Sequence, residues 1–305
     1  MWFKNLRQFQ LTEPLNDSAE ALSDKLSQAP FKPCGSQDMS RFGWVPPAGP
    51  DAQDYVHASN GYLMVCLKRQ EKILPAAVIN EHLEEKLADI RAEEGRPVGR
   101  KERQTLKDEI IFDLLPKAFS KSARDYAFIA PQERLILVNC SSSNRAEELL
   151  SQLREALGSL KAIPLTPQQA PAQLMTHWLR GEDLPADFVL GEECEFQAGK
   201  DSRVVRCKNV DLSAPEVASH LEAGMFASKL ALTWKEAIHF VLDDQFAVKR
   251  LKFEDKLLEQ ASDRNPETAA EAFDADFAVM SIELTALVKA LVEAFGGAVE
   301  PESVV

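Results

Sequence analysis

The sequence predicts an α+β fold in which antiparallel β-sheets are packed by helices and an inserted helical hairpin projects from the body. Short apolar or alternating segments bounded by turn residues predict strands in both halves of the chain. Two consecutive helix-spaced segments interrupt these strands after residue 75. The chain has 305 residues, of which 45% are hydrophobic, so it can bury a sizeable core divided among two or three structural units.

The first seventy residues mix strands with one helix. Residues 2–12 and 61–68 carry the apolar residues typical of strands, and the second of these segments is apolar enough to be buried. Between them, residues 17–29 place alanine and leucine at helical spacing after an Asn-Asp-Ser capping cluster. The Pro/Gly-rich stretch from Cys34 to Asn60 is expected to be a loop.

Residues 75–117 are expected to form the helical hairpin. A first helix spans residues 75–94 and ends at Gly95, which is a favourable C-terminal cap. A second helix spans residues 100–115 and is closed by Pro116. The apolar stripe of the two helices consists of Ile79, Leu83, Leu87, Ile90, Leu106, Ile110 and Leu114. This stripe is narrow, so we expect it to be buried partly within the hairpin and partly against a partner.

Strands and helices resume after the hairpin. Residues 125–140 predict a β-hairpin, and the next helix is expected to start at Asn144, with Glu147 completing a motif similar to a capping box. The Pro-rich segment near residue 165 is the expected boundary between two units. The predicted units are a central α+β body (residues 1–74 and 118–165), the hairpin (residues 75–117) and a second α+β domain (residues 166–305).

The second α+β domain has a similar composition of elements. Residues 192–210 predict a β-hairpin, and residues 214–224 predict a short helix that ends at a glycine. Three strands are expected within residues 225–253. A long acidic helix, at about residues 267–295, is expected to end the fold.

Charge is distributed unevenly along this acidic chain, whose formal net charge is -13. Residues 254–302 hold twelve acidic and three basic residues, whereas residues 96–124 hold only four acidic residues against eight basic ones. The eight basic residues are Arg96, Arg100, Lys101, Arg103, Lys107, Lys117, Lys121 and Arg124. A second, smaller basic group contains Arg250 and Lys252, which would share one face of a strand.

Either a solvated helix start or a phosphate-binding surface would explain the first basic group. Two features favour binding. Cations at the N-terminal turn of a helix oppose the helix dipole, so they reduce helix stability without an evident structural benefit. They also lie at the end of a projecting hairpin, where flexible side chains can reach phosphate oxygens without base-specific geometry. The sequence therefore predicts a nucleic-acid surface that lacks sequence specificity.

Local motifs give no support for catalysis, and no cofactor or metal is expected. The chain has no P-loop, dinucleotide-binding, nucleophile-elbow or H-E-x-x-H motif. His82 is expected to lie on a solvated helix face, turned away from Glu81 and Glu85. The serines of "NCSSSN" are ordinary helix caps. Asp243 and Asp244 suit a tight turn, although a metal-dependent nuclease could use such a pair.

The chain is expected to be cytosolic. Its five cysteines are scattered without a C-x-x-C pair, which argues against a disulfide framework and against a zinc site. No apolar run is long enough to span a membrane, and the first residues lack the features of a secretory signal.

Blocks of sequence along nearly the whole chain resemble the bacterial recombination-associated RdgC family. These blocks are "MWFKNL", "RFGWVPP", "GRKERQTLKDEI" followed by "LLPKAF", "WLRGEDLPADFVLGEECEF" and "SKLALTWKEAIHFVLDDQFAVKRLKFED". They occur in the same order along the chain, so the resemblance is specific.

The resemblance implies a ring-shaped homodimer of two curved subunits, each with a body, a helical tip and a base, closed by tip–tip and base–base contacts. It further implies that duplex DNA passes through a positively lined hole, that the protein is associated with the nucleoid, and that it limits RecA-driven strand exchange by occupying DNA. It implies no catalytic residues. The ten basic residues named above are then the candidate DNA-binding residues.

A different class of function remains open. The acidic segment at residues 254–302 could bind the recombinase directly, with DNA contact incidental.

Overall fold

Two antiparallel sheets and eight α-helices make up the part of the chain that the computed structural model describes, residues 1–199, 203–262 and 266–300. The first sheet has the order β2-β4-β5-β6-β1-β7, with β3 paired to β4, and the second has the order β12-β11-β10-β8-β9. The strands of the first sheet are β1 (Arg7–Leu11), β2 (Ser40–Val45), β3 (Val56–Ser59), β4 (Tyr62–Lys72), β5 (Ser120–Ala130), β6 (Leu135–Val138) and β7 (Ala162–Pro164). Those of the second are β8 (Phe188–Ala198), β9 (Val204–Lys208), β10 (Met225–Trp234), β11 (Ile238–Asp243) and β12 (Val248–Phe253).

Helices α1 (Ala19–Ser27) and α4 (Ser143–Leu157) cover one face of the seven-stranded sheet. Their apolar residues recur at helical spacing, and Leu22, Leu149 and Leu153 are fully buried. They form one cluster with residues that alternate along the strands, such as Val65 and Ile129.

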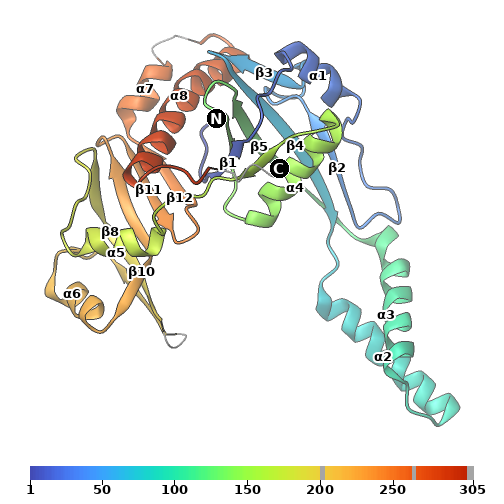
Figure 1. Ribbon diagram of the computed structural model, residues 1–305. Helices are drawn as coiled ribbons and strands as arrows, with labels where there is room; N and C mark the ends of the chain where they lie inside the picture. Colours follow the sequence, from blue (N-terminus) through green and yellow to red (C-terminus); the bar gives the residue numbers. More distant parts are fainter. Residues whose placement is uncertain (200–202, 263–265, 301–305) are drawn as a thin grey trace.

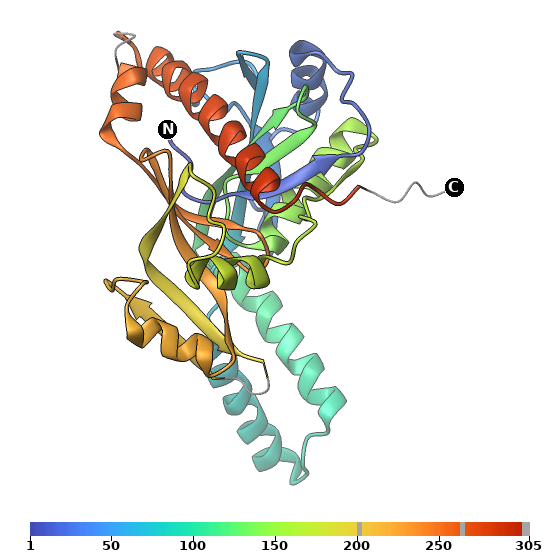
Figure 2. The ribbon, with the colours of Figure 1, turned by 60° about the vertical axis from the view of Figure 1, so that its left-hand side comes forward.

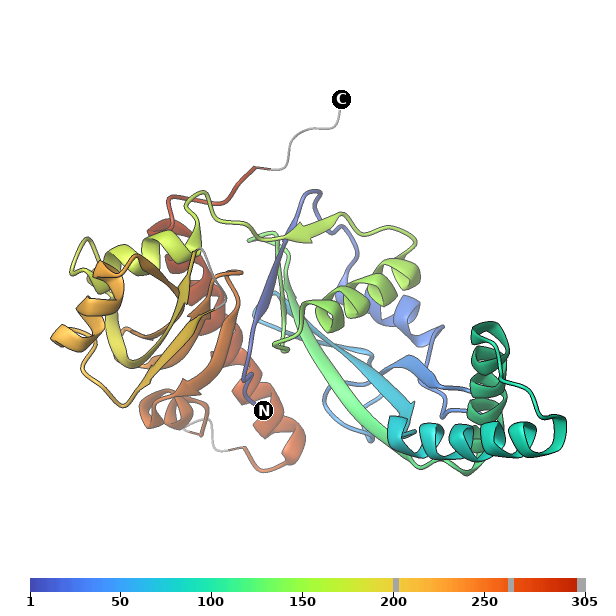
Figure 3. The ribbon, with the colours of Figure 1, turned by 90° about the horizontal axis from the view of Figure 1, so that it is seen from below.

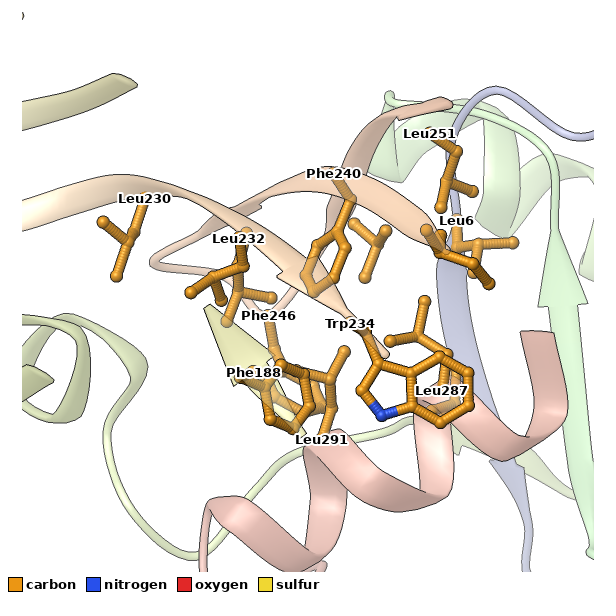
Figure 4. Packing of buried hydrophobic residues seen from close by; sticks show 14 of the residues in the cluster. Leu6, Phe188, Leu230, Leu232, Trp234, Phe240, Phe246, Leu251, Leu287 and Leu291 are labelled. Atoms are coloured by element: carbon orange, nitrogen blue, oxygen red, sulfur yellow. The ribbon is translucent and has the colours of Figure 1, made fainter. Parts of the chain in front are cut away.

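Helix α8 (Ala269–Ala294) packs against the other face of this sheet and against the five-stranded sheet, as Figure 2 shows. The Phe277 ring lies 5.9 Å from the ring of Phe128 on β5. Farther along α8, Leu287 and Leu291 lie beside Trp234 and Phe188 of the second sheet (Figure 4). One apolar cluster therefore spans both sheets.

Three shorter helices accompany the five-stranded sheet. They are α5 (Pro171–Leu179), α6 (Pro215–Glu222) and α7 (Asp255–Ser262). Trp178 of α5 and Val217 of α6 are buried in the same cluster as Trp234. Because these helices and α8 supply that cluster, one face of the second sheet is apolar while the other carries charged side chains.

The start of the chain joins the two sheets directly. Leu6 exchanges backbone hydrogen bonds with Val248 of β12 at 2.7 and 3.2 Å. The amide of Leu251 donates to the carbonyl of Lys4 at 2.8 Å. Since β1 continues from this segment into the first sheet, residues 4–11 run along an edge of one sheet and then through the other.

Helices α2 (Ala76–Glu94) and α3 (Arg100–Leu114) are inserted between the adjacent strands β4 and β5. They contact each other and extend away from the sheets (Figures 1 and 3). Their contact is a small cluster of four buried residues, Ile79, Leu83, Leu87 and Ile110. A short 3-10 helix, η1 (Leu115–Lys117), leads from α3 to β5. The predicted extents of both helices are confirmed.

Part of the predicted loop at residues 34–60 is wrong, because β2 and β3 lie within it. Gly43, within β2, is required by the close packing of two backbones: a Cβ at this position would lie 2.2 Å from the Cα of Phe31. The predicted strand at residues 2–12 is also shorter, since β1 begins at Arg7.

Two helix starts differ from the prediction. The expected cap at Asn144 is wrong: Ser142 is the N-cap of α4, and its hydroxyl accepts a hydrogen bond from the amide of Arg145. Helix α5 was not predicted, because the Pro-rich segment that contains Pro171 is typical of a loop, although proline is also favourable in the first turn of a helix.

None of the helices described is long and apolar enough to cross a membrane.

The packing of α8 predicts unequal effects of truncating two of its side chains. Leu287 is fully buried and Ile282 is 45% exposed. We expect Leu287→Ala to lower the free energy of unfolding by about 3 kcal/mol, because it removes buried methyl groups and leaves a cavity. Ile282→Ala should change it by less than about 0.5 kcal/mol. Urea unfolding measures both, and equal losses would contradict the packing described.

Candidate nucleic-acid interface

Arg96, at the turn between α2 and α3, is held by two glutamates. Its Nη1 and Nη2 donate to the two carboxylate oxygens of Glu102 at 2.7 and 2.6 Å, and its Nε donates to Glu94 at 2.5 Å. These hydrogen bonds, above all those of Glu102, raise the pKa of the guanidinium and lower the pKa of Glu102. This predicted binding residue is therefore already neutralised within the chain.

Four of the other seven cations of the first group lie along α3, and they differ in their partners. Arg103 donates to Glu84 of α2 at 2.6 Å. Among the described residues, Arg100, Lys101 and Lys107 have no acidic partner within ion-pair distance. Two of these three lie in the first turn of α3, where Gly99 supplies no side-chain cap. Positive charge is therefore left uncompensated at the helix end where the dipole disfavours it.

Lys117, Lys121 and Arg124 do not form one continuous positive surface. Lys117 is exposed in η1, but Lys121 and Arg124 are three positions apart in β5. Successive side chains of a strand point to opposite faces, so these two cations lie on opposite sides of the sheet. Lys121 lies opposite Glu71 of β4, whereas Arg124 lies opposite Lys68.

Arg250 and Lys252 are both exposed on β12, with Leu251 buried between them. The strand has a bulge here, and Arg250 adopts a left-handed backbone conformation with φ of 53°. Its guanidinium is 2.8 Å from a carboxylate oxygen of Glu193 on β8. Lys252 has no acidic partner within ion-pair distance in the described residues.

A network of charges on the exposed face of the five-stranded sheet was not predicted. Its centre is Glu195 of β8, whose carboxylate is 2.7 Å from Arg206 and 2.8 Å from Lys229. Glu193 and Glu195 alternate with the buried Cys194 and Phe196. That alternation was a usable signal in the sequence, but the cationic partners come from β9 and β10 and depend on strand pairing.

The turn interpretation of Asp243 is confirmed. One of its carboxylate oxygens accepts hydrogen bonds from the amides of Gln245 and Ala247 at 3.0 and 2.8 Å. The other is 2.6 Å from Nζ of Lys249. Burial and the charge of Asp243 raise the pKa of Asp244. The described residues contain no group of three or more His, Cys, Asp or Glu side chains arranged to hold a metal ion.

The prediction that His82 is turned away from Glu85 is wrong. Its Nδ1 lies 3.3 Å from a carboxylate oxygen of Glu85, three residues later on α2. Residues three apart on a helix are neighbours, and both of these side chains are exposed.

Comparison with known proteins gives matches along nearly the whole chain. A family described as "Putative exonuclease, RdgC" matches residues 1–298. The recombination-associated protein RdgC of Psychromonas ingrahamii is 42% identical over 298 residues, which cover 97% of this chain and 99% of that protein. The proteins of the same name from Yersinia enterocolitica and Yersinia pestis are 43% identical over 97% of this chain and 98% of their own length.

The position of Glu195 makes part of the stability dependent on pH. Burial alone would raise the pKa of this carboxyl, but hydrogen bonds from Lys229, Arg206 and Ser228 outweigh burial and lower the pKa from 4.5 to about 2. A group whose pKa is lowered by folding contributes stability above its unfolded pKa and loses it as the pH falls. We therefore expect Glu195→Gln to lose less stability than the parent protein between about pH 5 and pH 2.

Urea unfolding across this pH range measures the effect. The control is Glu259→Gln, at an exposed position of α7, which should follow the parent protein. Parallel losses in all three proteins would show that Glu195 has no such role.

Proposed function

The chain belongs to the RdgC family of recombination-associated proteins, and on this premise we propose that it binds duplex DNA without sequence specificity as a ring-shaped homodimer. Bound in this way, it occupies DNA and limits RecA-mediated recombination. Association with the nucleoid follows from the same activity.

The observation that carries the proposal is the uncompensated charge of α3. The chain has a formal charge of -13, yet Arg100, Lys101 and Lys107 have no carboxylate within ion-pair distance among the described residues. Long cationic side chains on an extended pair of helices suit contacts with phosphate oxygens, which fix a protein on DNA without reading its sequence. Release of counterions from the DNA would supply the affinity.

The homodimer is supported by apolar side chains near the α2–α3 pair that nothing in the described chain covers. Phe119, which follows η1, is 84% exposed, and Phe112 of α3 is 59% exposed. Aromatic residues this exposed are favourable anchors for a partner. A second copy of the chain is the partner that the family resemblance implies.

The rival hypothesis is that the acidic C-terminal segment binds the recombinase directly. Contacts within the fold already engage two of the carboxylates that it would use. Asp274 of α8 binds Nε2 of His57 at 2.9 Å, and Asp276 holds the amino group of Met1 and the indole N–H of Trp2. These carboxylates stabilise the fold and are not available in full to a partner.

No catalytic role is proposed for Asp243, although the family description names an exonuclease. Both oxygens of its carboxylate already have partners in the turn and at Lys249.

The proposal predicts that the unpaired cations of α3 control duplex affinity. We expect the triple variant Arg100→Gln, Lys101→Gln, Lys107→Gln to bind all duplexes more weakly, whatever their sequence. The slope of log K against log salt should become shallower by about 2.7, since each phosphate contact contributes about 0.9. Fluorescence anisotropy with duplexes of two unrelated sequences, over a series of salt concentrations, measures both quantities.

A control with the same change in charge is Lys25→Gln, Lys161→Gln, Lys289→Gln, because each of these lysines is paired with a carboxylate elsewhere on the protein. It should keep most of the parent affinity. Equal weakening in both variants would place the interface elsewhere. The rival hypothesis would be supported if the parent protein bound the recombinase in the absence of DNA and did not bind duplex DNA.

The proposed dimer predicts a specific effect at Phe119. Phe119→Asp should shift the protein from dimer toward monomer, because it places a charge in an apolar contact, while the exposed position leaves the fold unchanged. Sedimentation velocity over a range of concentrations measures the shift. Ile163→Asp, at a partly exposed position of β7, serves as the control. An unchanged dimer in the Phe119 variant would contradict this contact.

A further inference from the structure

The β4–β5 ribbon sorts its charged side chains by face. Residues paired directly across two antiparallel strands point to the same face, and every second pair shares it. One face of the ribbon carries Lys68 opposite Arg124, Gln70 opposite Ser122, and Lys72 opposite Ser120. The other face carries Leu67 opposite Asp125, Arg69 opposite Ala123, and Glu71 opposite Lys121.

Charges on the second face are compensated. Arg69 lies 2.6 Å from Glu71. The carboxylate of Asp125 binds Arg145 of α4, and Lys121 has Glu71 as its neighbour across the strands. This face therefore pairs its charges in the way expected of a structural surface.

Charges on the first face are all positive. Within the described residues, Lys68, Lys72 and Arg124 have no carboxylate within ion-pair distance. Nζ of Lys68 lies 4.3 Å above the ring of Phe31, and Nζ of Lys72 donates to a backbone carbonyl, that of Ala118, at 3.4 Å. Arg124 lies beside the hydroxyl of Tyr126. These contacts position the cations and leave their charge in place.

The direct opposition of Lys68 and Arg124 reduces stability. Like charges at paired positions of neighbouring strands repel each other, and the next pair along the ribbon, Gln70 and Ser122, offers only neutral groups. A carboxylate at either of those positions would have relieved the repulsion. The first face thus keeps two cations that repel each other, whereas positive and negative charges balance on the second face. This difference indicates that the first face is adapted to an external polyanion.

The dimensions of this face suit a nucleic-acid backbone. Lys68 and Lys72 are four residues apart on one strand, which corresponds to about 14 Å. Measured along the axis of a duplex, this length corresponds to about four phosphates of one strand. The ribbon leads directly into α2 and η1, so the face is continuous with the elements that carry the cations of α3.

We propose that the face formed by Lys68, Lys72 and Arg124, here called the ribbon face, is a second phosphate-binding surface for duplex DNA. It contacts the backbone of the duplex by charge and does not read bases. This inference rests on the proposed DNA binding and extends it from α3 to the body of the protein.

The test is the double variant Lys68→Gln, Arg124→Gln. We expect weaker duplex binding and a salt slope shallower by about 1.8, from the loss of two phosphate contacts. We also expect an unchanged or raised melting temperature, because the repulsion between the two cations is removed. The parallel measurements are anisotropy titrations over a salt series and thermal unfolding followed by circular dichroism.

The matched control is Lys161→Gln, Lys289→Gln, which changes the net charge by the same amount at lysines paired with Glu13 and Glu133. Its salt slope should equal that of the parent protein. A ribbon-face variant that binds like this control would overturn the inference, even where the parent protein binds DNA tightly. A parent protein without salt-dependent duplex binding would instead overturn the proposed function itself. A lowered melting temperature in the ribbon-face variant would show that the two cations have a structural role and would also overturn the inference.

Discussion

The burial of one apolar face of α8 against two different sheets is the interaction on which the rest of the structure depends. The first half of the helix packs on the seven-stranded sheet through Phe277, and the second half packs on the five-stranded sheet through Leu287 and Leu291. Backbone pairing between Leu6 and Val248 adds a direct link between the sheets. Burial of so many large side chains is worth far more than any single ion pair. The relative position of the two sheets is therefore set by apolar packing, and charged residues are free to serve other purposes.

The insertion of α2 and α3 between β4 and β5 has a consequence for these charges. The two strands continue past the end of the apolar core in order to reach the helices. Near the core they contribute Met64 and Phe128, whereas farther out the same face carries Lys68 and Arg124. Beyond the core, Lys68 and Lys72 are half-buried and Arg124 is exposed, so solvation permits charged side chains there. Alternation along a strand then allows one face to keep compensated charges while the other keeps only cations.

Much of the secondary structure could be predicted from the sequence, because α2, α3, α8 and strands such as β4, β5 and β10 carry apolar residues in the pattern of a helix or a strand. The errors arise where a residue has two possible meanings. Gly43 marks a close backbone contact within a strand, and Pro171 marks a helix start, yet both are also typical of loops.

The candidate interface was less predictable, because it depends on which residues meet across elements. Arg103 is paired with Glu84 at a distance of nineteen positions along the chain, so its neutralisation follows from the packing of α2 on α3. Lys68 was overlooked although Arg69 and Lys72 are close to it in the sequence, because the residues that share its face depend on strand alternation and pairing. It lies beside Arg124 only through the register of β4 with β5.

An acidic protein can bind a polyanion when some of its cations are grouped on one surface and have no acidic partner there. At physiological ionic strength, exposed charges farther apart than about 8 Å are largely screened from each other. The acidic residues of α8 therefore have little effect on a phosphate at α3 or at the ribbon face. Two of them are also engaged within the fold, since Asp274 contacts His57 and Asp276 pairs with the amino group of Met1. The acidic surface instead disfavours DNA wherever no unpaired cation is present. The negative net charge therefore repels DNA from most of the surface. It restricts the duplex to the few surfaces where positive charge has no acidic partner.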